Sequence, residues 1–331
     1  MKTVAVARRA MATRFEILLY GDDEVRLRAA GEEALDEIER LEARLSLYRP
    51  ASEISRINAR ASSERVRVEP SVFRLLQRAQ TLHRESDGAF DITIAPMVRC
   101  WGFMGGTGQM PDEASLAEAR GQVGMNWVEL CEEDFSVRFL RAGMMLDLGA
   151  IGKGCAVECA AEVLREAGMT SALVHGGTST VQAIGAPLGE EAWKVAVQTP
   201  EAPPASARSL SRADSASESF NDSVLAVVPL KDEAMSVSAV HGRSFESDGK
   251  TYGHVIDPRT GSPVQGALLA AIALPSATET DALSTALLTL GAPGHKKVAG
   301  LRVGMRSLIA WRDGSTAAIR VETDGIELRR P

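Results

Sequence analysis

The stretch around which this chain of 331 residues is organised is His254-Val255-Ile256-Asp257-Pro258-Arg259-Thr260-Gly261. It predicts the end of a short apolar strand that runs into a turn, because proline fixes φ and lacks an N–H donor, while glycine permits a left-handed exit. The turn is expected to present a histidine, a carboxylate and a guanidinium close together at the strand end.

The second informative segment, Asp281-Ala282-Leu283-Ser284-Thr285, follows twenty residues later. Its carboxylate and hydroxyls have the spacings i, i+3 and i+4, which place them on one face of a helix. Asp281, Ser284 and Thr285 are therefore candidate oxygen ligands of a hard cation such as Mg²⁺, and an arginine and a histidine nearby would complete a phosphate site. The alternative is that Asp281 caps a helix over 281–290, with both hydroxyls bonding back to the preceding turn.

The composition is that of an ordinary globular protein, with 45% hydrophobic and 24% charged residues, and the length allows one large or two medium domains. The net charge of −7 argues against a nucleic acid or an anionic membrane held by bulk electrostatics. Any phosphate that the protein binds must therefore be held by local groups.

The sequence shows no targeting or membrane segment. Residues 1–10 carry Lys2, Arg8 and Arg9 without an apolar core of signal-peptide length, and no apolar run approaches a membrane span. As written, the chain is expected in the cytoplasm, and export stays open if the true start lies upstream. The four cysteines, at 100, 131, 155 and 159, form no CxxC pair and fit no zinc spacing. Cys155 and Cys159, four residues apart on an expected helix, are interpreted as two small buried residues.

Hydrophobic periodicity predicts helices and strands in alternation. Helices are expected over 24–47, 52–58, 70–86, 112–123, 152–168 and 281–290. Strands are expected within 3–20 and over 143–148, 171–175, 193–199, 224–228, 235–239 and 268–274, with hairpins at 128–140, around 247–249 and at 308–321. Residues 200–222, rich in Ala, Ser and Pro, read as a disordered or loosely packed insertion. The many hairpins favour an α+β fold with mixed or antiparallel sheets and packed helices.

A glycine-rich turn is predicted in Leu146-Asp147-Leu148-Gly149-Ala150-Ile151-Gly152-Lys153-Gly154, between a strand and a helix N-terminus. Such a turn offers backbone N–H groups and a positive dipole end to an anion. Lys153 adds a cation there and Asp147 a carboxylate. The segment has neither the P-loop spacing nor the GxGxxG fingerprint, so a purely structural turn remains the alternative.

Three further positions have two interpretations each. In the turn Asp87-Gly88-Ala89-Phe90-Asp91, Phe90 is either a core residue or a ring-stacking surface. Tyr48, beside Arg49 at a helix end, is a surface residue or the wall of a ligand site. His175, at a strand end before two glycines, is a ligand or a structural histidine.

These stretches, taken in order, resemble the signature blocks of the ApbE family, the FAD:protein FMN transferases. The blocks span most of the chain: Met11-Ala12-Thr13-Arg14-Phe15, LSLYRPASEISRIN at 45–58, GAFDITIAPMVRCWGF at 88–103, and the segments 146–154, 254–261 and 281–285. The resemblance implies a single T-fold-like α+β domain over 1–331 that binds FAD and Mg²⁺. It also implies transfer of the FMN moiety of FAD to a Ser or Thr hydroxyl of an acceptor flavoprotein, with release of AMP.

The resemblance assigns roles to individual residues. The positions that match contacts to FAD are Met11, Tyr48, Ala89, Phe90, Asp91, Asp147, Lys153 and Ile256. Those that match the Mg²⁺ site are the carbonyl of Ala150 and the side chains of Asp281 and Thr285, with Ser284 beside them. His254 matches the proton acceptor near the phosphates, and Lys153 would share with Mg²⁺ the stabilisation of phosphoryl charge.

Two segments depart from the family pattern. The Gly-Gly-Asp of the family is replaced within His175-Gly176-Gly177-Thr178-Ser179, and its Ser-Gly by Ser238-Ala239. Two other functions use overlapping residues: an Mg²⁺-dependent FAD pyrophosphatase that gives FMN and AMP, and a flavin carrier that does not transfer. The presence of both the metal-ligand set and His254 favours the transferase over the carrier, and the products separate the transferase from the pyrophosphatase.

Overall fold

The computed structural model describes residues 2–200, 224–240, 242–313 and 318–329. Its centre is an eight-stranded sheet in which all neighbouring strands are antiparallel. In spatial order the strands are β1 (Lys2–Ala10), β2 (Thr13–Gly21), β6 (Ala172–Gly176), β7 (Thr180–Ile184), β10 (Ala234–Ala239), β15 (Ala267–Leu274), β16 (Arg306–Arg312) and β17 (Ile319–Asp324).

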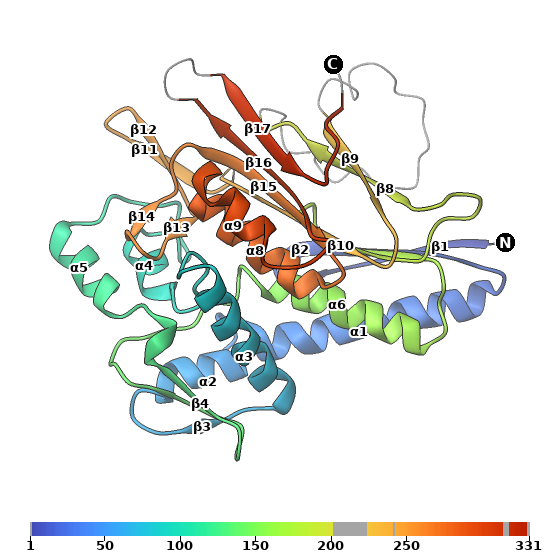
Figure 1. The fold of residues 1–331 in the computed structure, drawn as a ribbon. Helices are drawn as coiled ribbons and strands as arrows, with labels where there is room; N and C mark the ends of the chain where they lie inside the picture. Colours follow the sequence, from blue (N-terminus) through green and yellow to red (C-terminus); the bar gives the residue numbers. More distant parts are fainter. Residues whose placement is uncertain (1, 201–223, 241, 314–317, 330–331) are drawn as a thin grey trace.

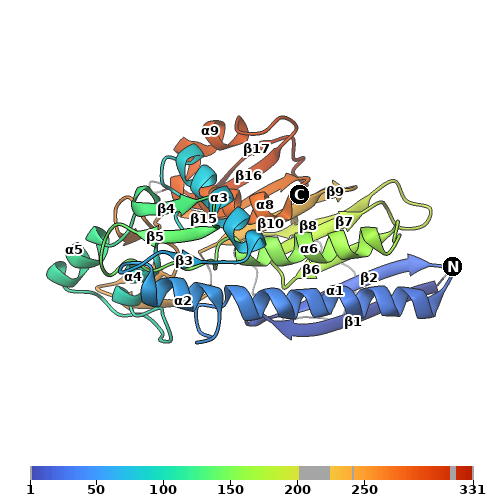
Figure 2. The same cartoon turned by 90° about the horizontal axis from the view of Figure 1, so that it is seen from below.

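Three helices cover one face of this sheet: α1 (Glu24–Leu45), α6 (Gly152–Glu166) and α8 (Ala277–Leu290) (Figures 1 and 2). Alternate residues of β2, such as Phe15, Ile17 and Leu19, are fully buried on the helical side, as expected from the two-residue period of a strand. The opposite face packs on the hairpin of β8 (Trp193–Gln198) and β9 (Val224–Leu230).

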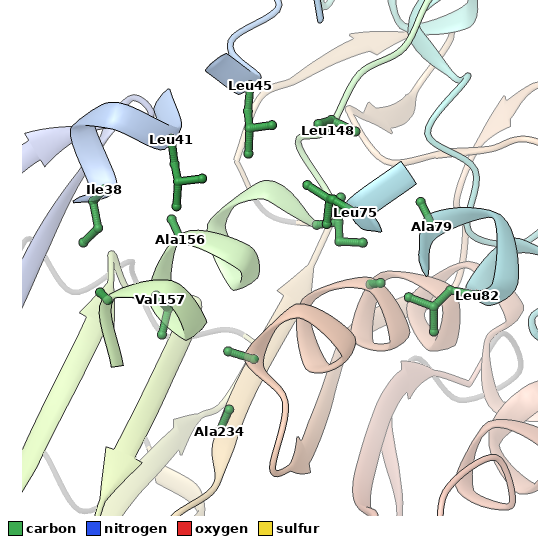
Figure 3. Close-up of a cluster of buried hydrophobic side chains, with 14 of the residues drawn as sticks. Ile38, Leu41, Leu45, Leu75, Ala79, Leu82, Leu148, Ala156, Val157 and Ala234 are labelled. Atoms are coloured by element: carbon green, nitrogen blue, oxygen red, sulfur yellow. The ribbon is translucent and has the colours of Figure 1, made fainter. Parts of the chain in front are cut away.

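The core continues from the helical layer into a second group of elements (Figure 3). Ile38 and Leu41 of α1 and Ala156 of α6 lie in one cluster with Leu75 and Leu82 of α3 (Pro70–Glu85). Around α3 lie α2 (Glu53–Arg60) and a small sheet of β3 (Val66–Arg67), β5 (Ser136–Phe139) and β4 (Val128–Cys131). This packing fixes the glycine-rich turn before α6 against the helices.

A third group of elements, at one end of the large sheet, carries the segment 254–261 (Figure 1). It contains α4 (Ala95–Cys100), α5 (Glu113–Gly121), the hairpin of β11 (Ser244–Ser247) and β12 (Lys250–Gly253), and the short hairpin of β13 (Ile256–Asp257) and β14 (Ser262–Pro263) (Figure 1). Rings of Trp101, Phe103, Phe245 and Tyr252 pack together there, with centroids 5.4–6.3 Å apart. The remaining short helices are η1 (Met125–Trp127), η2 (Ala292–Gly294) and α9 (His295–Ala299).

The α+β class predicted from the sequence is confirmed, and most predicted elements are present within one or two residues of the expected ends. The expected strand over 143–148 is wrong: that segment makes only a single bridge pair, between Met145 and Ile94. The alternating segment 3–20 is two strands, because Met11 and Ala12 turn the chain with φ of 48° and 59°. The strand β7 was not predicted.

The expected insertion 200–222 lies outside the described residues apart from Pro200. None of the helices in the described ranges is long and apolar enough to cross a membrane.

Candidate active site

Asp281 is buried in the second turn of α8 and does not cap it. Ser276 is the N-cap, and its hydroxyl accepts from the N–H of Glu279 at 3.2 Å. The sequence interpretation in which Asp281 caps a helix beginning at 281 is therefore wrong by one turn. Because Ser276 satisfies the helix end, the carboxylate of Asp281, only 4% exposed, is left for other partners.

The N-terminus of α6 supplies one of those partners. The N–H of Gly154 donates to Oδ2 of Asp281 at 2.9 Å, and Nζ of Lys153 lies 3.9 Å from Oδ1. A Cβ on Gly154 would lie 2.2 Å from the carbonyl oxygen of Ala277, so only glycine lets α6 approach α8 this closely. The predicted anion-binding turn thus holds a carboxylate of the protein itself.

A layer of hydroxyls lies beside Asp281. Ser284 and Thr285 donate to the carbonyl oxygen of Asp281 at 3.0 and 3.2 Å, so both hydroxyls bond back to the preceding turn, as the structural alternative predicted. From β10, Oγ of Ser238 lies 2.9 Å from Oγ of Ser284 and 3.1 Å from Oγ1 of Thr285. Ser238 was not predicted as a site residue, because the sequence analysis considered it only together with Ala239, which replaces the glycine of the family's Ser-Gly pair.

This set of donors fits Mg²⁺ better than a soft metal. No group of three or more His, Cys, Asp or Glu that could hold a metal occurs in the described ranges. One carboxylate with hydroxyl and carbonyl oxygens suits Mg²⁺, which keeps several waters and uses substrate phosphates as ligands. Ala150, expected to offer its carbonyl, lies half-buried in the turn that leads into α6.

Asp147 and Lys153 lie on the two sides of that turn. Oδ1 of Asp147 accepts from the N–H of Gly149 at 2.8 Å, and Nζ of Lys153 donates to the carbonyl of Gly149 at 3.3 Å. Burial raises the pKa of Asp147, against the opposing effects of the Gly149 hydrogen bond and of the positive charges on Arg243 and Lys153. The structure thus places both predicted residues near one another, together with an arginine that was not predicted.

His254 follows β12 and is held by Arg243. Its backbone N–H donates to the carbonyl oxygen of Arg243 at 3.1 Å, and its Nδ1 lies 3.3 Å from the same oxygen. A carbonyl can only accept, so Nδ1 carries the proton and Nε2 is left as the basic nitrogen. Burial lowers the pKa of His254, and the charges of Arg243 and Lys153 act in the same direction. The imidazole is therefore neutral near pH 7.

The expected trio of histidine, carboxylate and guanidinium in 254–261 is divided in the structure. Asp257 accepts from Nε and Nη2 of Arg259 at 2.9 and 2.7 Å, so these two residues form an ion pair within the turn. Nε1 of Trp101 donates to the carbonyl of Gly261 at 2.8 Å and ties the turn to α4. Arg259 is thus bound within the turn by Asp257, whereas His254 is bound to Arg243.

The residues expected to contact flavin differ greatly in exposure. The side chain of Ala89 is 2% exposed and that of Phe90 1%, in agreement with the core interpretation of Phe90. Tyr48 is 65% exposed, whereas Ile256 is 5% exposed. Met11 is half-buried in the β1–β2 turn, where Glu42 accepts from its N–H at 2.8 Å.

The carboxylate of Asp91 is occupied by the fold. Its Oδ1 accepts from the N–H and the hydroxyl of Thr93 at 2.7 and 2.6 Å, and its Oδ2 lies 3.2 Å from Nδ1 of His83. Burial lowers the pKa of His83, but the hydrogen bond and charge of Asp91 outweigh it, so that this pKa is raised. The side chains of the turn 89–91 therefore serve the core and its hydrogen bonds.

His175 lies apart from the cluster around Asp281. Its neighbours Leu173 and Val181 pack on the β8–β9 side of the sheet, whereas Val174 faces the helices. Its buried Nε2 has no hydrogen-bond partner among the described residues, and burial lowers its pKa to about 4. This placement favours the structural interpretation of His175.

Comparison with known proteins adds a family to this geometry. A model of the ApbE family matches residues 11–308. The FAD:protein FMN transferase of Haemophilus influenzae is 27% identical over 302 residues, which cover 88% of this chain and 81% of the relative. That of Treponema pallidum is 30% identical over 277 residues, covering 80% and 72%.

Two solved structures share the fold. The ApbE protein of Thermotoga maritima superimposes with a TM-score of 0.82 at 26% identity, over 96% of each chain. The apo flavinyl transferase ApbE of Pseudomonas stutzeri gives a TM-score of 0.81 at 25% identity, over 98% of this chain and 95% of the other. With its sequence matched from residue 11 to residue 308 and its fold shared with these proteins, the chain belongs to the ApbE family.

Proposed function

We propose that this protein transfers the FMN moiety of FAD to a Ser or Thr hydroxyl of an acceptor flavoprotein and releases AMP. The observation that carries the proposal is the convergence of a buried carboxylate, an ammonium group and a neutral imidazole. Asp281 lies 3.9 Å from Lys153, and both Lys153 and Arg243 lower the pKa of His254 through their charges. The relatives from Haemophilus influenzae and Treponema pallidum are named FAD:protein FMN transferases.

The proposed reaction exchanges one phosphorus–oxygen bond for another. The acceptor oxygen bonds to the FMN phosphorus, the bond from that phosphorus to the bridging oxygen breaks, and AMP leaves with the electron pair. His254 accepts the hydroxyl proton at Nε2, since its Nδ1 donates to Arg243. The lowered pKa of His254 keeps this nitrogen unprotonated at neutral pH.

In this proposal, cations neutralise the negative charge of the phosphates. Lys153 lies at the N-terminus of α6 with its ammonium near Gly149 and Asp281, where it can turn to a phosphate oxygen. Asp281, Thr285, Ser284 and the carbonyl of Ala150 would hold Mg²⁺, which when bound neutralises charge on phosphoryl oxygens and orients them. Ser238 supports this set through its bonds to both hydroxyls.

We also propose a flavin-contacting surface on the same unit. Met11, Tyr48, Asp147, Lys153 and Ile256 are its side-chain candidates. Ala89, Phe90 and Asp91, whose side chains are buried, would contribute through their backbone. Because these positions and the metal set run from residue 11 to residue 285, we propose that 1–331 acts as one domain.

The test is an incubation of the purified protein with FAD, Mg²⁺ and a peptide that carries a Thr flavinylation site, followed by mass spectrometry of all products. Transfer predicts a peptide heavier by one FMN and an equal amount of AMP, with both lost in Asp281→Ala. FMN and AMP without modified peptide, for every peptide offered, would replace the transferase with an FAD pyrophosphatase. Intact, bound FAD would indicate a carrier.

A further inference from the structure

The two ends of the β11–β12 hairpin lie next to each other at the site. Arg243 directly precedes β11 and His254 directly follows β12, and the backbone N–H of His254 donates to the carbonyl of Arg243. The hairpin projects from the end of the large sheet, beside the β13–β14 turn (Figure 1). The position of the guanidinium is thus coupled to that of the proposed base.

The side chain of Arg243 is fixed at one corner. Its Nη1 donates to the carbonyl of Phe103 at 2.7 Å, and Phe103 is fully buried against Phe245 of β11. A guanidinium has five N–H donors in a planar fork. Phe103 uses one of them, and no hydrogen bond to another described residue occupies the rest of the fork.

Unlike Arg259, Arg243 has no carboxylate partner in the part of the chain that the structure describes. Within 4.0 Å of its nitrogens there is no Asp or Glu oxygen belonging to the described ranges. By contrast, Asp257 holds Arg259 with two hydrogen bonds. The charge of Arg243 acts instead on Asp147 and His254, the same two groups on which Lys153 acts. The positive charges of Arg243 and Lys153 thus act on the same two groups.

We propose that Arg243 contacts the substrate, binding the diphosphate of FAD through its free N–H groups across the site from Lys153. This inference rests on the proposed function. The geometry carries it: a guanidinium anchored at one corner, exposed at the others and adjacent to the proposed base suits two oxygens of a phosphate. Arg243 moves no proton. It holds the phosphate that Lys153, a single-point donor, cannot orient alone.

Binding, measured apart from transfer, tests the inference. FAD and riboflavin are titrated by flavin fluorescence in the presence of EDTA against the wild-type protein, Arg243→Gln and Arg243→Lys. Arg99→Gln, an exposed arginine of α4, is the control. We expect Arg243→Gln to lose about 10- to 100-fold in FAD affinity and to bind riboflavin, which has no phosphate, within about twofold of wild type. Arg243→Lys should lie between, and Arg99→Gln should match wild type.

Two outcomes would overturn the inference alone. An equal loss of FAD and riboflavin affinity would make Arg243 a structural residue of the hairpin, and unchanged FAD affinity would show that it does not touch the diphosphate. If Arg243→Gln does not fold, Arg243→Lys decides by the same comparison. Wild-type protein that binds FAD but modifies no acceptor overturns the proposed function and leaves the Arg243 comparison readable. Wild-type protein that binds no FAD overturns both.

Discussion

The turn 89–91 and the two ends of the β11–β12 hairpin differ in whether their polar side chains have hydrogen-bond partners within the protein. In the turn, both oxygens of Asp91 are held by Thr93 and His83. At the hairpin ends, Nε2 of His254 and most of the Arg243 fork are free of protein partners in the described ranges. Satisfied groups stabilise the fold, whereas free groups beside a buried carboxylate are available to a ligand. The comparison separates residues that build the site from residues that act in it.

Among the changes predicted here, replacing His254 should have the largest effect, a loss of transfer rate. A small effect would show that the free groups at the hairpin ends do not act in the reaction. His254→Ala is expected to slow transfer by about 10²- to 10⁴-fold, the usual contribution of a general base, with FAD affinity within about twofold. Single-turnover rates at saturating FAD measure the first quantity and fluorescence titration the second. A full transfer rate in His254→Ala would show that His254 is not the general base.

His175 offers a contrast, because its buried Nε2 has no partner among the described residues but the residue lies on the other face of the sheet. Its pKa of about 4 lies below the ordinary 6.5, so between these values the unfolded chain binds more protons than the folded one. The free energy of unfolding should therefore fall as the pH drops from 6.5 to 4, by about 3 kcal/mol. Urea titrations at several pH values measure this, and His175→Leu should flatten the dependence. A change in FAD affinity in that variant would contradict its placement away from the site.

A matched pair on α8 separates the hydroxyl that we place at the metal from one that is only helical. Thr285→Ala is expected to weaken the apparent affinity for Mg²⁺ by about tenfold, equivalent to ~1.4 kcal/mol. Thr289→Ala, one turn later, removes a hydroxyl that donates to the carbonyl of Thr285 and should leave that affinity unchanged. The Mg²⁺ dependence of AMP release measures both. Equal losses in the pair would show that the effect belongs to the helix.

His83 should give the smallest effect, and only on stability. Its pKa is raised in the folded protein, so the stability from the His83–Asp91 pair is present below pH 6.5 and is lost as the pH rises through the raised value. His83→Gln is expected to cost about 1 kcal/mol at low pH and little above that range. Denaturation curves across this pH range provide the measurement. Loss of FAD binding without loss of stability would place His83 among the acting residues.

Much of the fold was predictable because local patterns agree with the tertiary structure. The spacing of Leu35, Ile38 and Leu41 predicted α1, and Ser52 correctly marked the start of α2. The start of α8 was less predictable, since Thr278, Glu279 and Thr280 look like a polar loop but are buried. The N–H of Thr278 donates to Glu158 of α6, Glu279 pairs with Arg302, and the hydroxyl of Thr280 lies 2.7 Å from that of Ser236 of β10. The family and enzyme class expected from the motifs are confirmed by the family match and by the names of the relatives.

The motifs of the candidate site could be chosen from the sequence, but the pairings of their side chains could not. Asp281, Lys153 and His254 were chosen from turn and helix signals, and the structure brings Asp281 and Lys153 within 3.9 Å. The sequence predicted that Asp257 and Arg259 lie close together, but not that they bind each other and so take Arg259 from the site. It also gave no sign that Arg243, eleven residues before His254, would have no carboxylate partner among the described residues. The placement of Arg243 depends on distances across the fold, which spacing along the chain does not encode.

Transfer to a hydroxyl is tested most directly by measuring whether an oxygen atom from water enters the products. FAD, Mg²⁺ and the acceptor peptide are incubated with the protein in water enriched in oxygen-18, and the products are weighed by mass spectrometry. Transfer to a hydroxyl predicts FMN-peptide and AMP that both lack the heavy isotope, because water enters neither new bond. Heavy oxygen in free FMN or in AMP, with unmodified peptide, would show that water is the acceptor and would contradict the transferase account.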